Sequence, residues 1–176
     1  MEIFWDELTA GIPDSTEFAH ILLRLVAAIL LGALVGVQRE RAGKAAGLRT
    51  HILVTLGTTM FVLASAGSGM SLDGVSRVIQ GLATGIGFIG AGAILKLSDT
   101  REIQGLTTAA GIWMTAAIGV AVGLGNLGLA ILATILTWII LASFDQFEMQ
   151  QEKNKAKETE IPQQEIFRAA IAIRRS

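Results

Sequence analysis

The chain has 176 residues, of which 52% are apolar and only 16% are charged, and its mean hydropathy is +0.58. A water-soluble domain carries about 25% charged residues, so most of this chain is suited to a lipid bilayer. The formal net charge of −1 provides no large basic surface for a nucleic acid, and the lack of cysteine excludes disulfides and thiolate metal sites.

The N-terminal segment 1–17 is acidic and contains no lysine or arginine. An apolar stretch follows it that is long enough for a spanning helix, which needs roughly 20 apolar residues. Four more such stretches follow, separated by short connections. We therefore predict an all-α polytopic membrane protein with five transmembrane helices at about 18–37, 48–66, 76–97, 105–124 and 127–144.

Most of the basic residues lie in or beside the connections before the second and fourth spans and in the segment after residue 144, whereas the turn between the second and third spans is bounded only by Arg77. The acidic N-terminal segment and the turn between the fourth and fifth spans contain none. By the positive-inside rule, this asymmetry places the N-terminus outside the cytoplasm and the C-terminus inside it. The sequence thus predicts a periplasmic segment 1–17, a transmembrane domain 18–144 and a short charged cytoplasmic tail 145–176.

Glycine is concentrated in the third predicted span, where Gly81, Gly85 and Gly92 share one face. In lipid, small residues let neighbouring helix backbones approach closely. We therefore expect this helix to be the central element of a close-packed bundle, surrounded by the other helices, and we expect the glycine rows to favour homo-oligomers. The predicted helix-packing positions are Gly32, Gly36, Gly81, Gly85, Gly87, Gly90, Gly92, Gly111 and Gly119.

The fourth predicted span has a small residue at every fourth position, namely Thr107, Gly111, Thr115, Gly119 and Gly123. One interpretation is tight packing between helices. The other is a narrow path lined by threonine hydroxyls and backbone carbonyls. The sequence leaves both interpretations open.

Arg24 lies about two turns inside the first predicted span, where a charge is costly and suggests a function. Asp73, just before the third span, is its natural partner and is also the candidate position for a metal ion. Alternatively, Asp73 caps the third helix and pairs with Arg77 one turn later. The two interpretations are a functional cluster of these three side chains and an ordinary helix start.

Arg39 and its basic neighbours lie where the first span leaves the membrane and fit a topology signal. Glu40 adds nothing to such a signal, and we expect it to clamp Arg49 at the start of the next helix. His51 lies one turn inside the second span. We expect it to bond a neighbouring helix rather than to bind a ligand or carry a proton.

These residues occur in long, ordered motifs. Arg24 and Leu25 lead into GALVGVQRERAGKAAGLRTHILVTLG, and DGVSR, TGIGFIGAGAIL and GLTTAAGIWMTAAIGVAVGLG follow. Over about residues 20–142 the chain resembles the MgtC/SapB family of bacterial inner-membrane proteins. Carried over to this sequence, the family pattern marks Arg24, Arg39, Glu40, Gly47, Leu48, Arg49, Thr50, His51, Asp73, Arg77, Gly85, Gly87, Gly90, Gly92, Gly105, Thr107, Thr108 and Trp113.

The resemblance implies a multi-pass protein of the bacterial inner membrane that serves growth at low magnesium and, in some members, virulence. It implies a non-enzymatic regulator that acts through membrane protein partners; the alternative is a transporter or passive pathway for magnesium or another cation. No cofactor is expected, apart from Mg²⁺ as a ligand or transported ion. Longer family members carry a folded cytoplasmic C-terminal domain, where this chain has only residues 145–176.

Overall fold

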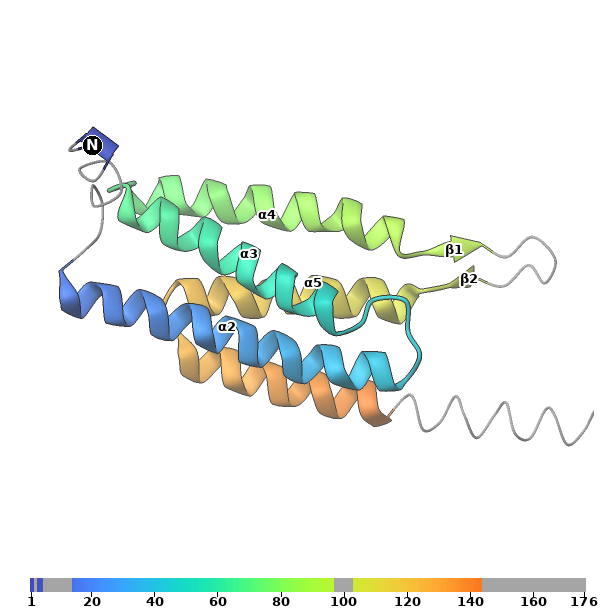
Figure 1. Ribbon diagram of the computed structural model, residues 1–176. Helices are drawn as coiled ribbons and strands as arrows, with labels where there is room; N and C mark the ends of the chain where they lie inside the picture. The colour runs from blue at the N-terminus through green and yellow to red at the C-terminus, as the bar shows by residue number, and fades with distance from the viewer. Residues whose placement is uncertain (2, 5–13, 97–102, 144–176) are drawn as a thin grey trace, which may run out of the picture. The chain divides into compact units, whose positions relative to one another are not determined.

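The computed structural model describes residues 1, 3–4, 14–96 and 103–143. The chain divides into two compact units, Met1–Ile139 and Ile140–Ser176, and the first contains the four labelled helices (Figure 1). These are α2 (Ser15–Arg41), α3 (Leu48–Gly67), α4 (Leu72–Gly92) and α5 (Leu106–Gly123), and a last helix, Leu127–Ser143, follows them. Two short strands, β1 (Leu95–Lys96) and β2 (Ile103–Gln104), pair antiparallel between α4 and α5.

The helices confirm the predicted all-α fold. The bounds of α3, α5 and the last helix lie within one residue of the ranges predicted for the second, fourth and fifth spans, whereas α2, Ser15–Arg41, extends beyond the predicted 18–37 at both ends. That these helices are the five membrane spans stays a prediction. The predicted span 76–97 was wrong at both ends. The helix α4 begins at Leu72 because the Ser71 side chain accepts a hydrogen bond from the backbone of Gly74, and it ends at Gly92 because the chain then enters strand β1. The predicted tail 145–176 and most of the acidic segment lie outside the described residues.

The ends of α2 and α5 are set by local residue chemistry. At the start of α2, the Asp14 carboxylate accepts hydrogen bonds from the backbone N–H groups of Thr16 and Glu17, at 3.1 and 2.9 Å. After α2 and after α5, the chain turns at Gly43 and Gly125, whose φ angles are +66° and +83°. Glycine adopts this left-handed conformation without steric cost, so each helix stops there and the next can run back along it.

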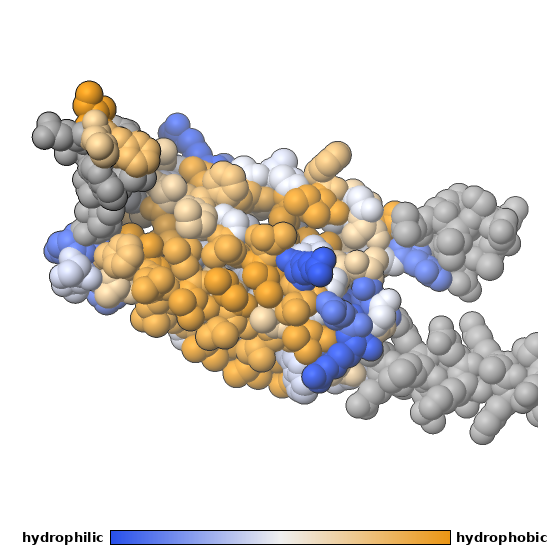
Figure 2. All heavy atoms as spheres, in the orientation of Figure 1, coloured by the Kyte–Doolittle hydropathy of each residue, from blue (hydrophilic) through white to orange (hydrophobic). Residues whose placement is uncertain are grey.

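The outer surface of the bundle is much more apolar than that of a water-soluble protein. Large apolar side chains of α2 and the last helix are exposed and form a continuous surface between hydrophilic ends (Figure 2). The helices α2, α3 and α5 are each long and apolar enough to cross a membrane. Such a surface is stable only against lipid, so the chain is an all-α membrane protein. The buried positions of α3 are mostly polar: His51, Thr55, Thr58, Thr59 and Ser65, with Val62.

The centre of the bundle is formed by α3 and α5 together, and the expectation that the glycine-rich helix occupies it was wrong. Helix α3 packs along both α2 and α5, whereas α4 packs mainly against α5 and buries a narrow stripe (Figure 1). The reason is that glycine has no side chain to bury, so α4 is held mainly by Ile86, which packs near Ile112 and Ala116. Within the described residues, a Cβ atom added to α4 meets nothing within 4 Å at Gly81, Gly85, Gly87 or Gly92.

Candidate functional site

Two glycines of α2 let α3 approach it closely. A Cβ atom at Gly32 would collide with the Thr55 hydroxyl and lie 2.8 Å from the His51 carbonyl oxygen. A Cβ atom at Gly36 would lie 2.7 Å from the Cα of Leu48. Real Cβ atoms are not found this close to a backbone, so both positions require glycine at this helix crossing.

The opposite side of α3 packs against a second set of glycines, on α5. A Cβ atom at Gly119 would collide with the Thr58 hydroxyl and lie 2.5 Å from the Thr55 carbonyl oxygen. A Cβ atom at Gly123 would lie 2.7 Å from the Cβ of Val62. Helix α3 is therefore held between two glycine-lined faces, and its polar side chains fill the space between the backbones.

A polar cluster is buried between these faces. Its members come from α2, α3 and α5, and each is at most 4% exposed. Because buried polar groups are costly without hydrogen-bond partners, their bonds decide how the three helices fit together. The polar cluster consists of Arg39, His51, Thr55, Thr58, Thr59, Thr108 and Thr115.

His51 joins α3 to α5 through Thr115. The imidazole Nδ1 lies 2.7 Å from the Thr115 hydroxyl, which also lies 2.8 Å from the Gly111 carbonyl oxygen. A hydroxyl has one proton, so when Thr115 donates it to Gly111 it accepts the Nδ1–H of His51. The predicted bond between His51 and a neighbouring helix is thus present. About two turns further along α3, the Thr59 hydroxyl donates to the Gly119 carbonyl at 2.8 Å.

Two arginines of α2 contact the two ends of α5. Arg39 is only 1% exposed, and its Nη2 atom lies 3.5 and 3.4 Å from the hydroxyls of Thr107 and Thr108, in the first turn of α5. Arg24 donates from Nη1 to the carbonyl oxygen of Gly123, in the last turn, at 3.0 Å. A cation is favourable there because helix carbonyls give the C-terminus a partial negative charge.

The partner expected for Arg24 is therefore different from the one the structure shows. No ion pair joins Arg24, Asp73 and Arg77, all three of which are described. Asp73 is exposed in the first turn of α4, and Ser71 rather than Asp73 is its N-cap. Arg24 does not pair with Asp73 because its guanidinium bonds to the last turn of α5 instead.

Glu40 acts on the start of α3, as expected, but through a different partner. Its Oε2 atom accepts a hydrogen bond from the backbone N–H of Leu48 at 2.9 Å, while the Arg49 side chain is exposed. The residue before the helix, Gly47, has no side chain to cap it. A Cβ atom at Gly47 would lie 2.9 Å from Glu40 Oε2, so the glycine also makes room for the carboxylate.

Comparison with known proteins gives the family. Residues 25–150 match the sequence model of the MgtC family. The chain belongs to the MgtC family. Protein SrpB of Synechococcus elongatus is 40% identical over 143 residues, which cover 75% of this chain and 79% of that protein. No solved structure matches the chain.

Two further relatives are longer than this MgtC-family chain. The Escherichia coli K12 protein named "Putative magnesium transporter YhiD" is 42% identical over 135 residues, covering 73% of this chain and 62% of YhiD. Protein MgtC of Salmonella typhimurium LT2 is 44% identical over 115 residues, covering 65% of this chain and 48% of MgtC. The chain thus spans about half the length of that relative.

The polar cluster contains residues that the sequence analysis passed over. Thr55, Thr58 and Thr59 follow His51 at helical spacings of four, seven and eight, a polar stripe on an otherwise apolar helix that could have been recognised. In contrast, Trp113 is 52% exposed and lies outside the cluster. Among the described residues, no group of three or more His, Cys, Asp or Glu side chains could hold a metal, and a metal at Asp73 stays a prediction.

Proposed function

We propose that this MgtC-family chain is a non-enzymatic regulator of magnesium homeostasis that acts through other membrane proteins. We further propose that it is a multi-pass protein of the bacterial inner membrane with its N-terminus outside and its C-terminus inside. The name of its relative YhiD, "Putative magnesium transporter YhiD", supports the link to magnesium. The distribution of basic residues supports the orientation.

The observation that carries this proposal is the exposed glycine row of α4. We define the α4 glycine face as Gly81, Gly85 and Gly92, which share one side of the helix. Within the described residues, nothing lies within 4 Å of a Cβ atom added at any of them, unlike Gly32 or Gly119. In lipid, such a face favours the close approach of another helix. A helix of a partner protein would bury it.

The test replaces Gly85 by leucine. Gly85 is exposed and a Cβ atom added there meets nothing within 4 Å among the described residues, so Gly85→Leu should fold and reach the membrane normally. We expect this variant to lose rescue of growth at low magnesium in a host strain without its own MgtC-family protein. The matched control is Ala83→Leu, which adds the same side chain to an exposed position about 160° away around α4.

Two outcomes would contradict the proposal. One is full growth rescue by Gly85→Leu at normal membrane levels. The other is an equal loss of rescue with Ala83→Leu, which would indicate a general effect of bulk on α4. Thermal unfolding of both purified variants separates either result from misfolding.

The alternative is a passive pathway or carrier for magnesium or another cation, supported by the threonines of the polar cluster. Four of their hydroxyls, however, donate to backbone carbonyls, as Thr55 does to His51 O at 2.8 Å, and that of Thr108 accepts from Arg39. The buried guanidinium of Arg39 would also repel a divalent cation inside a low-dielectric bundle. Magnesium uptake by proteoliposomes, lost in Asp73→Ala, would support the alternative and overturn a purely regulatory function.

A further inference from the structure

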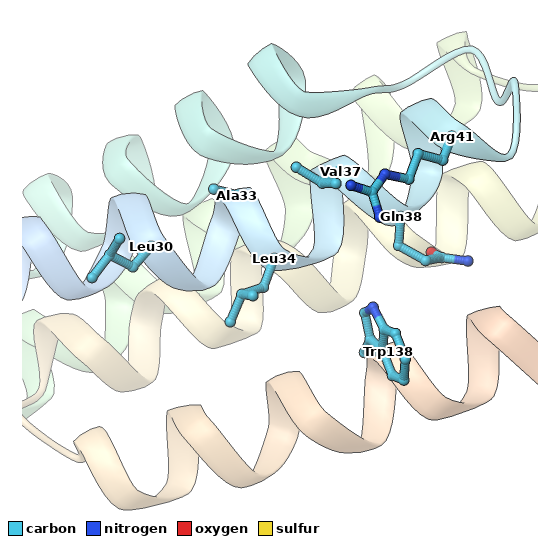
Figure 3. Close-up of a pocket in the computed structure, with 7 residues that line it drawn as sticks. All are labelled: Leu30, Ala33, Leu34, Val37, Gln38, Arg41 and Trp138. Carbon is cyan, nitrogen blue, oxygen red and sulfur yellow. The ribbon is translucent and has the colours of Figure 1, made fainter.

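A groove lies between α2 and the last helix, with a volume of about 680 Å³ (Figure 3). Figure 3 shows Trp138 extending from the last helix toward the α2 side chains. Among the described residues, those that line the groove are basic, polar or apolar, and none of them is acidic. The lining residues are Leu30, Ala33, Leu34, Val37, Gln38, Arg41 and Trp138.

The groove changes from apolar to polar along α2. Its first part is lined by Leu30 and Leu34, and its last part by Gln38 and Arg41. From Leu30 to Arg41 the helix rises about 16 Å, at roughly 1.5 Å per residue. This is close to half of the roughly 30 Å hydrocarbon thickness of a bilayer. The groove therefore has the length and polarity of one lipid acyl chain that ends at a headgroup.

The polar end of the groove carries a positive charge. Arg41 is exposed and makes no ion pair within the part of the chain that the structure describes, because its neighbour Glu40 bonds the backbone of Leu48. A guanidinium presents donors in a fork that fits the oxygens of a phosphate. Trp138, 48% exposed, adds an apolar ring with one N–H donor, the combination found where membrane meets water.

We propose that this groove binds one anionic glycerophospholipid of the cytoplasmic leaflet. An acyl chain lies against Leu30 and Leu34, and the phosphate is held by Arg41. The proposal rests on the orientation proposed above, which places Arg41 on the cytoplasmic side. Anionic headgroups of that leaflet attract basic residues at the ends of membrane helices.

The test measures lipid retention by native mass spectrometry. The full chain in detergent is incubated with phosphatidylglycerol or with phosphatidylcholine of the same acyl chains. We expect one phosphatidylglycerol to be retained in preference to phosphatidylcholine. Arg41→Gln should weaken phosphatidylglycerol binding about tenfold and remove the preference, because it removes a charge-assisted bond to phosphate. Arg49→Gln, an exposed arginine outside the groove, should have little effect.

A second variant, Ala33→Trp, fills the groove without changing charge and should lower retention of both lipids. Equal retention of the two lipids by the natural chain would overturn the proposal. So would an equal loss in Arg49→Gln and Arg41→Gln, or a lipid-free dimer in which a second copy fills the groove. Retention is measured on purified protein, so it is independent of the growth phenotype of Gly85→Leu.

Discussion

The buried polar side chains of α3 make hydrogen bonds that are individually weak. Their positions along the helix, however, fix how α3 aligns with α5. Hydrogen bonds between membrane helices contribute about 0.6 kcal/mol on average and up to about 1.7 kcal/mol. His51 and Thr59 each bond to α5, eight residues apart on α3, at 2.7 and 2.8 Å. Two such bonds on one helix pair fix its register along the axis, because sliding either helix would leave buried groups unpaired.

At the residue scale we predict that Thr115→Val destabilises the bundle, since valine keeps the shape of threonine but loses the hydroxyl that accepts from His51. The free energy of unfolding in detergent should fall by about 1 kcal/mol. Thr115→Ser keeps the hydroxyl and should retain most of the bond, although it loses a methyl group. If Thr115→Val unfolds at the same denaturant concentration as the natural chain, the bond contributes nothing to stability.

At the scale of the elements, glycine serves two different purposes in this chain. On α2 and α5 it allows backbone contact with α3, where there is no room for a Cβ atom at Gly32 or Gly119. On α4 it leaves a bare helix surface, at Gly85 for example, with no neighbour within the described residues. The same residue type therefore marks an internal packing site in one helix and an exposed face in another.

Whether an added Cβ atom meets a neighbour predicts opposite results for two Gly→Ala substitutions. Gly119→Ala should lower the thermal unfolding temperature markedly, because its methyl group would collide with Thr58 and approach the Thr55 carbonyl to 2.5 Å. Gly57→Ala adds the same atom to the middle of α3, where nothing lies within 4 Å among the described residues. It should be neutral or stabilising, since alanine is favoured in a helix by up to about 1 kcal/mol. Equal unfolding temperatures for the two variants would contradict this account.

At the scale of the whole molecule, the contacts of α2 fix its direction relative to α5. Arg39 meets the first turn of α5 and Arg24 its last, so the two helices are antiparallel with closely matched ends. The connection 42–47, between α2 and α3, therefore lies at the same end of the bundle as the start of α5. The predicted orientation places this end in the cytoplasm.

The lack of native cysteine allows a direct test of this orientation. Ala45→Cys places a thiol in the connection after α2, and Ser68→Cys places one after α3, both at exposed positions. In intact spheroplasts, a membrane-impermeant maleimide should label Ser68→Cys but not Ala45→Cys, and lysis should make Ala45→Cys reactive. Labelling in the reverse pattern would invert the topology and move Arg41 to the outer leaflet.

The sequence by itself determined the all-helical membrane fold and the family. Long apolar stretches in a chain with few charges have one stable arrangement in lipid, the helix, which satisfies its own backbone. The family followed from ordered motifs such as TGIGFIGAGAIL, which do not depend on knowing what packs against them. The starts of α3 and α5 were also predicted to within one residue, because each apolar run follows a connection that contains charged residues.

Only the tertiary structure decided which glycines are covered and which polar groups meet. The density of glycine indicated α4 as the central helix. Whether a glycine is buried, however, depends on the side chains of the neighbouring helices. It is α3 that supplies threonines to pack against the glycines of α2 and α5. Likewise, Arg24 could have met any nearby acceptor, and it was the position of α5 that supplied the Gly123 carbonyl instead of Asp73. Such pairings join residues 99 apart in the chain, and no local pattern specifies them.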